Sequence, residues 1–312
     1  MAAYLEIHRS GKLRERVDVA VSLLESCSVC PRSCGVNRLT GDAGKCRTPR
    51  EAIVSSYGPH FGEEAPLVGR SGSGTIFFTN CNLRCLFCQN YSISQLGEGQ
   101  KVSKEELAYI MLSLQAKGCH NINLVSPTHV VPQILEALEL AVESGLYLPL
   151  VYNSGGYDSV ETLRILDGII DIYMPDMKYD NEETAKELSG IENYPEINKA
   201  AIKEMHRQVG DLEINEEGVA QRGLLVRHLV LPHGLAGTKG IVEFLSKEIS
   251  PSTYVNIMAQ YHPCHKAFQI LSLGRRISST EFREALFLAR EAGLSRLDKA
   301  LPIETLRRDL SR

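Results

Sequence analysis

The chain has 312 residues, of which 43% are apolar and 23% charged, and its formal net charge is -4. These values fit one large α/β domain or two smaller ones, and they argue against nucleic acid or an anionic membrane as the main partner. The charged first thirty residues and the absence of a long apolar run predict a cytoplasmic protein without a signal peptide or membrane span. The nine cysteines are therefore expected to be metal ligands or catalytic thiols rather than disulfide partners.

The first 70 residues are predicted to form a small domain of one helix and a cysteine-rich segment. Apolar residues at helical spacing predict a helix over residues 12–26. Four cysteines follow among turn-forming residues, in a stretch too short to build a core by itself. We therefore expect domains over residues 1–70 and 71–312.

From about residue 72 onward, short apolar runs alternate with helical patterns. The alternation of strands and helices predicts parallel β-α units, and therefore an α/β fold. Six runs predict an open partial (β/α)6 barrel rather than a closed eight-stranded one. The predicted strands are residues 75–79, 122–126, 148–152, 169–174, 224–231 and 254–259.

Helix signals fill the intervals between these strands. Ser103 and Glu106 have the spacing of a capping box, and Asp158 is predicted to cap the helix over residues 158–166. Residues 212–223 are predicted to be an inserted hairpin. The other predicted helices cover residues 130–144, 195–209, 238–248 and 279–292.

Three cysteines, Cys81, Cys85 and Cys88, follow the first predicted strand with the spacing C-x3-C-x2-C. A [4Fe-4S] cluster normally has four cysteine ligands, so three thiolates would leave one iron without a protein ligand. An open metal position allows a small molecule to bind and react, as in catalytic zinc sites. The location also agrees with this role, because ligand-binding residues of parallel α/β folds gather at the carboxyl ends of strands.

The motif resembles that of the radical S-adenosylmethionine (SAM) superfamily, in which the residue before the third cysteine is usually aromatic, as Phe87 is here. The resemblance implies that the open iron binds the amino and carboxylate groups of SAM. It implies an oxidoreductase in which reductive cleavage of SAM gives methionine and a 5′-deoxyadenosyl radical that abstracts hydrogen from a substrate. A flavodoxin or ferredoxin would supply the electron.

Over roughly residues 25–290, the order of motifs resembles the pyruvate formate-lyase activating enzyme and its relatives. In that family, a turn after the third strand, an aspartate-x-lysine motif and an arginine-containing strand hold SAM. The resemblance therefore implies a role in SAM binding for Asn153, Ser154, Asp176, Lys178 and Arg227. Because characterised relatives act on a backbone glycine of a partner enzyme, it also implies a protein or peptide substrate.

The chain departs from that family after the second predicted strand. Relatives have a Gly-Gly-Glu motif there, which binds the SAM ammonium, whereas this chain has the run 125–129, Val-Ser-Pro-Thr-His. The ammonium still requires hydrogen-bond acceptors. We expect them to come from backbone carbonyls or hydroxyls of Ser126 and Thr128, or from a nearby carboxylate.

A second cysteine motif in the first domain has the spacing C-x2-C-x3-C-x11-C and is predicted to form a closed metal site. Zinc would bind these four thiolates tetrahedrally and stabilise the segment. A second [4Fe-4S] cluster would instead relay electrons or bind substrate. The sequence leaves both open for Cys27, Cys30, Cys34 and Cys46.

Two residues after the last predicted strand are candidates for catalysis. Cys264 could donate a hydrogen atom to a substrate radical or bind a metal, and His262 lies two positions before it. The alternative to an enzyme is an iron-sulfur or zinc protein that carries electrons and does not cleave SAM. Formation of 5′-deoxyadenosine distinguishes the two hypotheses.

Overall fold

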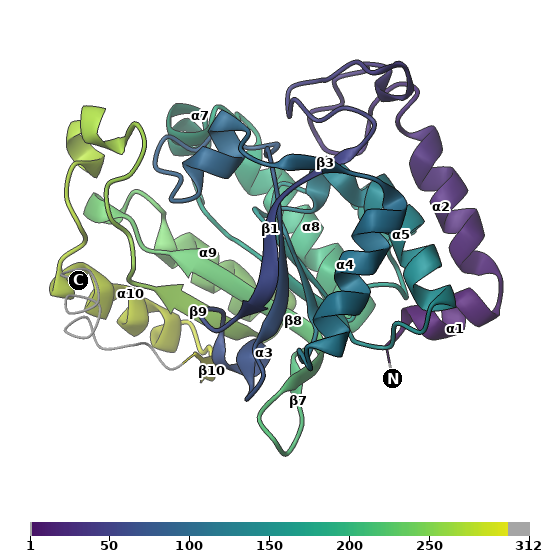
Figure 1. Ribbon diagram of the computed structural model, residues 1–312. Helices are drawn as coiled ribbons and strands as arrows, with labels where there is room; N and C mark the ends of the chain where they lie inside the picture. The colour runs from purple at the N-terminus through teal and green to yellow at the C-terminus, as the bar shows by residue number, and fades with distance from the viewer. Residues whose placement is uncertain (1, 299–312) are drawn as a thin grey trace.

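The computed structural model describes residues 2–298, which form an α/β fold around one open sheet (Figure 1). Along the sheet the strands follow the order β10-β9-β8-β6-β5-β4-β2-β1-β3, and β7 pairs with β8 outside this path. The strands are β1 (Ala52–His60), β2 (Ser73–Phe78), β3 (Gln100–Val102), β4 (Ile122–Val125), β5 (Leu150–Ser154), β6 (Ile172–Pro175), β7 (Glu213–Ile214), β8 (Ala220–Leu229), β9 (Tyr254–Met258) and β10 (Arg296–Leu297).

Six neighbouring strands, β2, β4, β5, β6, β8 and β9, are parallel and correspond to the six predicted strands. The prediction of an open partial barrel is therefore confirmed. At one edge of the parallel set, β1 pairs antiparallel with β2 and β3 pairs antiparallel with β1. At the other edge β10 contributes a two-residue parallel pairing to β9.

Strand β1, which adds residues 52–60 to the sheet, was not predicted from the sequence. Gly58 and Pro59 normally weaken a strand prediction, but they lie beyond the residues of β1 that pair with β3, where β1 pairs with β2 alone. Residues of the predicted first domain thus pair with β2 of the second. The domain boundary near residue 70 remains a prediction.

The predicted helices are present close to their expected bounds, and so is the capping box of Ser103 and Glu106. The helices over residues 4–9 and 182–189 were not predicted. The cap of α6 differs from the prediction. Ser159, not Asp158, accepts the hydrogen bond from the Thr162 backbone N–H. The longer helices are α1 (Tyr4–Arg9), α2 (Lys12–Ser22), α4 (Lys104–Ala116), α5 (Val131–Glu143), α6 (Val160–Ile165), α7 (Glu182–Ser189), α8 (Tyr194–Val209), α9 (Thr238–Phe244) and α10 (Ser279–Glu291).

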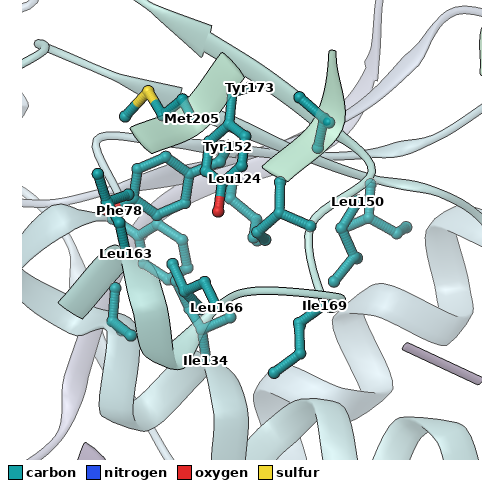
Figure 2. Close-up of a cluster of buried hydrophobic side chains, with 14 of the residues drawn as sticks. Phe78, Leu124, Ile134, Leu150, Tyr152, Leu163, Leu166, Ile169, Tyr173 and Met205 are labelled. Atoms are coloured by element: carbon teal, nitrogen blue, oxygen red, sulfur yellow. The ribbon is translucent and has the colours of Figure 1, made fainter. Parts of the chain in front are cut away.

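The main hydrophobic core lies between the parallel strands and the helices. Figure 2 shows Leu124 of β4, Tyr152 of β5 and Tyr173 of β6 among the buried side chains that pack together. Ile134 of α5 and Leu163 of α6 belong to the same cluster, so the helices cover this face of the sheet. None of the described helices is long and apolar enough to cross a membrane.

The carboxyl ends of the parallel strands point to one edge of the sheet, at the top of Figure 1, where α7 follows β6 and the cysteine-rich segment lies. The predicted hairpin is also present, because β7 pairs antiparallel with the start of β8. Its turn projects from the opposite edge, at the bottom of Figure 1. The loop that contains Cys81 follows β2 and therefore belongs to the carboxyl edge.

Candidate functional site

Cys81, Cys85 and Cys88 line a single cavity of about 130 Å³. The cavity lies where β2, β4, β5, β6 and β8 end or pass, so residues distant in sequence meet there. The structure brings six of the predicted SAM-binding residues to its wall, namely Ser126, Asn153, Ser154, Asp176, Lys178 and Arg227.

Backbone and amide hydrogen bonds fix the cysteine loop. Asn80, just before it, has a left-handed backbone with a φ of 69°, a conformation that asparagine tolerates better than most residues. Asn82 donates through Nδ2 to the Tyr157 carbonyl at 2.7 Å. Further along, the Leu86 N–H donates to the carbonyl of Leu188, at the end of α7, at 2.8 Å. The three thiols are thus positioned by the fold rather than by one another.

Each thiol of the loop also has a hydrogen-bond partner. The Ser189 hydroxyl donates to the Cys85 sulfur at 3.0 Å, and Ser94 lies 3.1 Å from the Cys88 sulfur. The Leu83 N–H donates to the Cys81 sulfur at 3.4 Å. Hydrogen bonds to thiolate sulfurs are one of the factors that set the reduction potential of an iron-sulfur cluster. The sequence offered no signal for Ser94 or Ser189, because the contacts depend on loop folding.

Burial dominates the acid-base chemistry of these thiols. It raises the pKa of Cys81 to about 12 and also raises the pKa of Cys85. Without a metal these two groups are therefore protonated at neutral pH. A metal that binds them must displace the protons, as in other thiolate sites.

A buried ion network faces the thiols across the cavity. Asp176 accepts hydrogen bonds from Arg227 at 2.9 Å and from Lys178 at 2.5 Å. Arg227 also donates to the Asn153 side-chain oxygen at 2.7 Å. Burial would raise the pKa of Asp176, but Arg227 and Lys178 outweigh it and hold that pKa below its ordinary value. With side chains only 16–18% exposed, these residues are not a surface pair.

Ser126 and Thr128, predicted near the SAM ammonium, differ in their surroundings. Ser126 lines the cavity, has a φ of 58°, and donates its backbone N–H to the Asn153 carbonyl at 2.8 Å. A non-glycine residue in this backbone region is uncommon and is often found at functional sites. Thr128 is buried away from the cavity lining and donates its hydroxyl to Asp158 at 2.6 Å.

Asp158, predicted as a helix cap, instead organises the wall of the cavity from behind. Its buried carboxylate accepts hydrogen bonds from Ser154 at 2.6 Å, from Thr128 at 2.6 Å and from Tyr152 at 2.9 Å. Burial raises the pKa of Asp158, while the hydroxyl donors oppose the shift. The carboxylate therefore orients the Ser154 hydroxyl at the end of β5.

Three other candidates lie outside the lining of this cavity. Phe87 is buried and packs edge-on against Tyr179 and Tyr261, with ring centroids 6.4 and 6.0 Å apart. His262 and Cys264 lie in the loop after β9, and the His262 ring contacts Gln89 at 3.3 Å. Phe87 thus supports the cysteine loop by packing, whereas catalytic roles for His262 and Cys264 remain predictions.

The N-terminal cysteines lie close to one another. Cys27, Cys30 and Cys46 are buried and Cys34 is half-buried. Burial raises the pKa of Cys30 to about 12, and the neighbouring thiols of the other three contribute in the same direction. A Cβ atom at Gly44 would lie 2.3 Å from the Cys34 sulfur, so glycine is needed at this close approach.

Arginine side chains connect the N-terminal cysteine segment to the site. Arg38 is fully buried, and its guanidinium lies 3.9 Å from the Cys27 sulfur and donates to the His129 carbonyl at 2.8 Å. Arg32 donates to the carbonyl of Asn82, inside the cysteine loop, at 2.6 Å. The two cysteine motifs are therefore packed against each other.

Within residues 2–298, no three or more His, Cys, Asp or Glu side chains are grouped as ligands for one metal ion. In a cubane cluster each thiolate binds a different iron, so its ligands need not converge on a single point. The donor chemistry of Cys81, Cys85 and Cys88 on one cavity fits such a cluster.

Comparisons with known proteins agree with this geometry. The sequence profile of the radical SAM superfamily matches residues 75–215. An uncharacterized protein of Methanocaldococcus jannaschii is 33% identical over 299 residues, covering 93% of this chain and 82% of that protein. The chain belongs to the radical SAM superfamily, whose members use a [4Fe-4S] cluster and SAM.

Among solved structures, a radical SAM methyltransferase from Sphaerobacter thermophilus is similar, with a TM-score of 0.51 and 14% sequence identity. The match covers 73% of this chain and 65% of the methyltransferase, so the chain spans less than two thirds of that structure. At this identity the likeness concerns the fold alone, and it agrees with the open barrel described above.

Proposed function

We propose that Cys81, Cys85 and Cys88 hold a [4Fe-4S] cluster with one open iron, and that the protein uses it to cleave SAM reductively. The observation that carries the proposal is the convergence of these thiols and the buried Asp176–Arg227–Lys178 network on one cavity. Among the described residues that line this cavity, no fourth thiol is present. The donor set therefore suits a cluster that leaves one position for SAM.

The cluster, when bound, supplies the electron that splits the SAM sulfonium into methionine and a 5′-deoxyadenosyl radical. The chain's own residues would bind and orient SAM. Lys178 and Arg227 offer hydrogen-bond donors and positive charge to its carboxylate. Asp176, ionised by its two cationic neighbours, offers acceptor oxygens to its ammonium or ribose hydroxyls. The Asn153 amide and the Ser126 backbone complete this polar wall.

The substrate donates a hydrogen atom to that radical. The resemblance to activating enzymes supports a glycine of a protein or peptide as one such substrate. The burial of Cys85 supports a reaction site that is shielded from solvent. A flavodoxin or ferredoxin would reduce the cluster. The exposed ring of Tyr91, stacked on His265 beside the cysteine loop, lies on a surface that such a donor could contact.

The test of this function is SAM cleavage by the wild-type protein. We expect the anaerobically reconstituted protein, reduced with dithionite, to form 5′-deoxyadenosine and methionine in equal amounts, as measured by liquid chromatography and mass spectrometry. The same protein without reductant should form neither. A reduced, cluster-loaded protein that leaves SAM intact would instead support an electron carrier.

We also propose that Cys27, Cys30, Cys34 and Cys46 hold a second metal. Their burial and mutual proximity support it, because four thiolates in one buried segment would require a compensating cation. The buried Arg38 guanidinium near Cys27 supports an anionic thiolate centre at this place. The N-terminal cysteine segment contacts the Cys81–Cys88 loop through Arg32, and this contact suits either a structural or an electron-relay role of the second metal.

Metal analysis of a variant with Cys81, Cys85 and Cys88 replaced by alanine tests the second site. We expect the variant to retain either about one zinc or about four irons per chain. Adding Cys30→Ala should remove that metal. A triple variant free of zinc and iron after anaerobic purification and reconstitution would contradict the proposal.

A further inference from the structure

A second, larger cavity of about 850 Å³ adjoins the cavity at the cysteines. The two share four lining residues, Asn90, Val125, Asn153 and Arg227. The larger cavity extends along β9 and past the N-terminal end of α3 (Ala65–Val68). A molecule bound in it can therefore reach the place where the proposed cofactor would react.

Glu64, which precedes α3, lines this larger cavity and is 6% exposed. Its Oε1 accepts a hydrogen bond from the Asn256 amide at 3.0 Å. Its Oε2 is buried and has no hydrogen-bond partner among the described residues. A buried carboxylate oxygen without a donor is unfavourable, and such atoms are rare in folded proteins. Glu64 therefore has an unsatisfied acceptor atom at the wall of the cavity.

The nearest cation does not satisfy this carboxylate. Arg227 Nε lies 4.0 Å from the Glu64 Oε1 atom, which is beyond hydrogen-bond distance. The guanidinium instead donates its hydrogen bonds to Asp176 and Asn153. Lys178 also donates to Asp176, so neither of the two cations of this network donates a hydrogen bond to Glu64.

Two further carboxylates lie on the same wall. Glu63 lines the cavity next to Glu64 and contacts the His60 ring at 2.9 Å. Asp298 lies on the same wall and accepts a hydrogen bond from Tyr254 at 2.7 Å. Carboxylate oxygens at a cavity wall are strong hydrogen-bond acceptors for a cationic donor.

Much of the remaining wall is apolar. Phe61, Phe77, Met258 and Phe282 line the cavity beside the acidic groups. An apolar wall with a few placed polar groups is typical of a small-molecule site. The cavity therefore suits a ligand with a cationic end and an apolar body.

We propose that the larger cavity binds an organic amine, with its ammonium group donating to the unpartnered oxygen of Glu64 and its apolar part against the aromatic wall. The identification of this amine as the substrate rests on the proposed function; its binding does not. Burial raises the pKa of Glu64, against the lowering effect of Arg227. A bound cation stabilises the ionised carboxylate.

Binding measurements on the cluster-reconstituted protein, without reductant, test the proposal. The probes are 2-phenylethylamine and n-hexylamine, each compared by anaerobic calorimetry with the alcohol of the same carbon skeleton. We expect at least one amine to bind about tenfold more tightly than its alcohol, because a charge-assisted hydrogen bond is lost in the alcohol. Equal affinities within both pairs, or no binding by either amine, would overturn the proposal.

The variant Glu64→Gln tests the residue itself. It should weaken amine binding by about tenfold and leave alcohol binding unchanged. Glu216→Gln, in the exposed turn between β7 and β8, is the matched control and should change neither affinity. An unchanged amine affinity in Glu64→Gln would assign the site elsewhere and refute the role of Glu64.

Two further observations separate this inference from the proposed function. The melting temperature of Glu64→Gln should not fall. The new side-chain amide can still accept the hydrogen bond from Asn256, and the hydrogen bond from Arg227 to Asp176 is unchanged. Formation of 5′-deoxyadenosine by the wild type is measured independently of amine binding. Amine binding without SAM cleavage would support the cavity assignment and contradict the proposed enzymatic function. SAM cleavage without amine binding would support the function and contradict the cavity assignment.

Discussion

Replacing Cys85 by alanine is expected to lower 5′-deoxyadenosine formation by more than about 100-fold. Mutating a residue that only hydrogen-bonds to a metal ligand already lowers metal affinity or activity by about 10–100-fold. Cys85 is one of three thiols at the cavity, and its loss leaves two protein ligands for the cluster. The iron content after anaerobic reconstitution should fall with the activity. Both are measured on the same sample, by metal analysis and by product quantification.

The matched control for this experiment is Cys119→Ala. Cys119 is also buried, but it precedes β4 and lines neither cavity at the proposed site. This variant should keep the iron content and activity of the wild type. If Cys85→Ala still cleaved SAM at the wild-type rate, the assignment of this thiol as a cluster ligand would be wrong.

Replacing Asp176 by asparagine should produce the largest loss of stability within the site. The change leaves the charges of Arg227 and Lys178 buried without their carboxylate. Removing one partner from a buried ion pair costs about 3–5 kcal/mol. We expect the free energy of unfolding to fall by about 3 kcal/mol in anaerobic denaturant titrations, and SAM binding to weaken with it.

The stability contribution of Asp176 also has a defined pH dependence. Its pKa in the folded protein is lowered, so the contribution is present above the ordinary aspartate pKa of about 3.9 and is lost as the pH falls below it. Asp18→Asn is a suitable control, because its pair with Arg14 is mostly exposed and contributes about 0–1 kcal/mol. Equal destabilisation by both substitutions would contradict a buried network at Asp176.

The parallel strands could be predicted from the sequence because their signals are local. A strand buried on both faces is a short, mostly apolar run, as in 122–125 and 150–152, and the pattern does not depend on distant partners. The capping box at Ser103 is equally local. By contrast, β1 is stabilised by pairing with β2 and β3, which are distant or short elements, and its own sequence contains Gly58 and Pro59.

The site was predictable in part for the same reason. The three cysteines form a compact motif, whereas the contact between Asp176 and Arg227 joins residues 51 positions apart and was reached through the family resemblance. Asp158 has a sequence position typical of a helix cap. In the structure, however, its carboxylate accepts hydrogen bonds from three side-chain hydroxyl groups, those of Thr128, Tyr152 and Ser154. Glu64 offered no signal, because its environment is built by Asn256 and Arg227 from β9 and β8.

The most direct test of the central claim is electron-nuclear double resonance on the reduced cluster with isotopically labelled SAM. The open-iron assignment predicts hyperfine coupling of the cluster to the amino nitrogen and the carboxylate oxygen of SAM. It also predicts that this coupling disappears in Cys85→Ala. A cluster that shows no coupling to SAM, or whose fourth iron is bound by a side chain of this chain, would contradict the account.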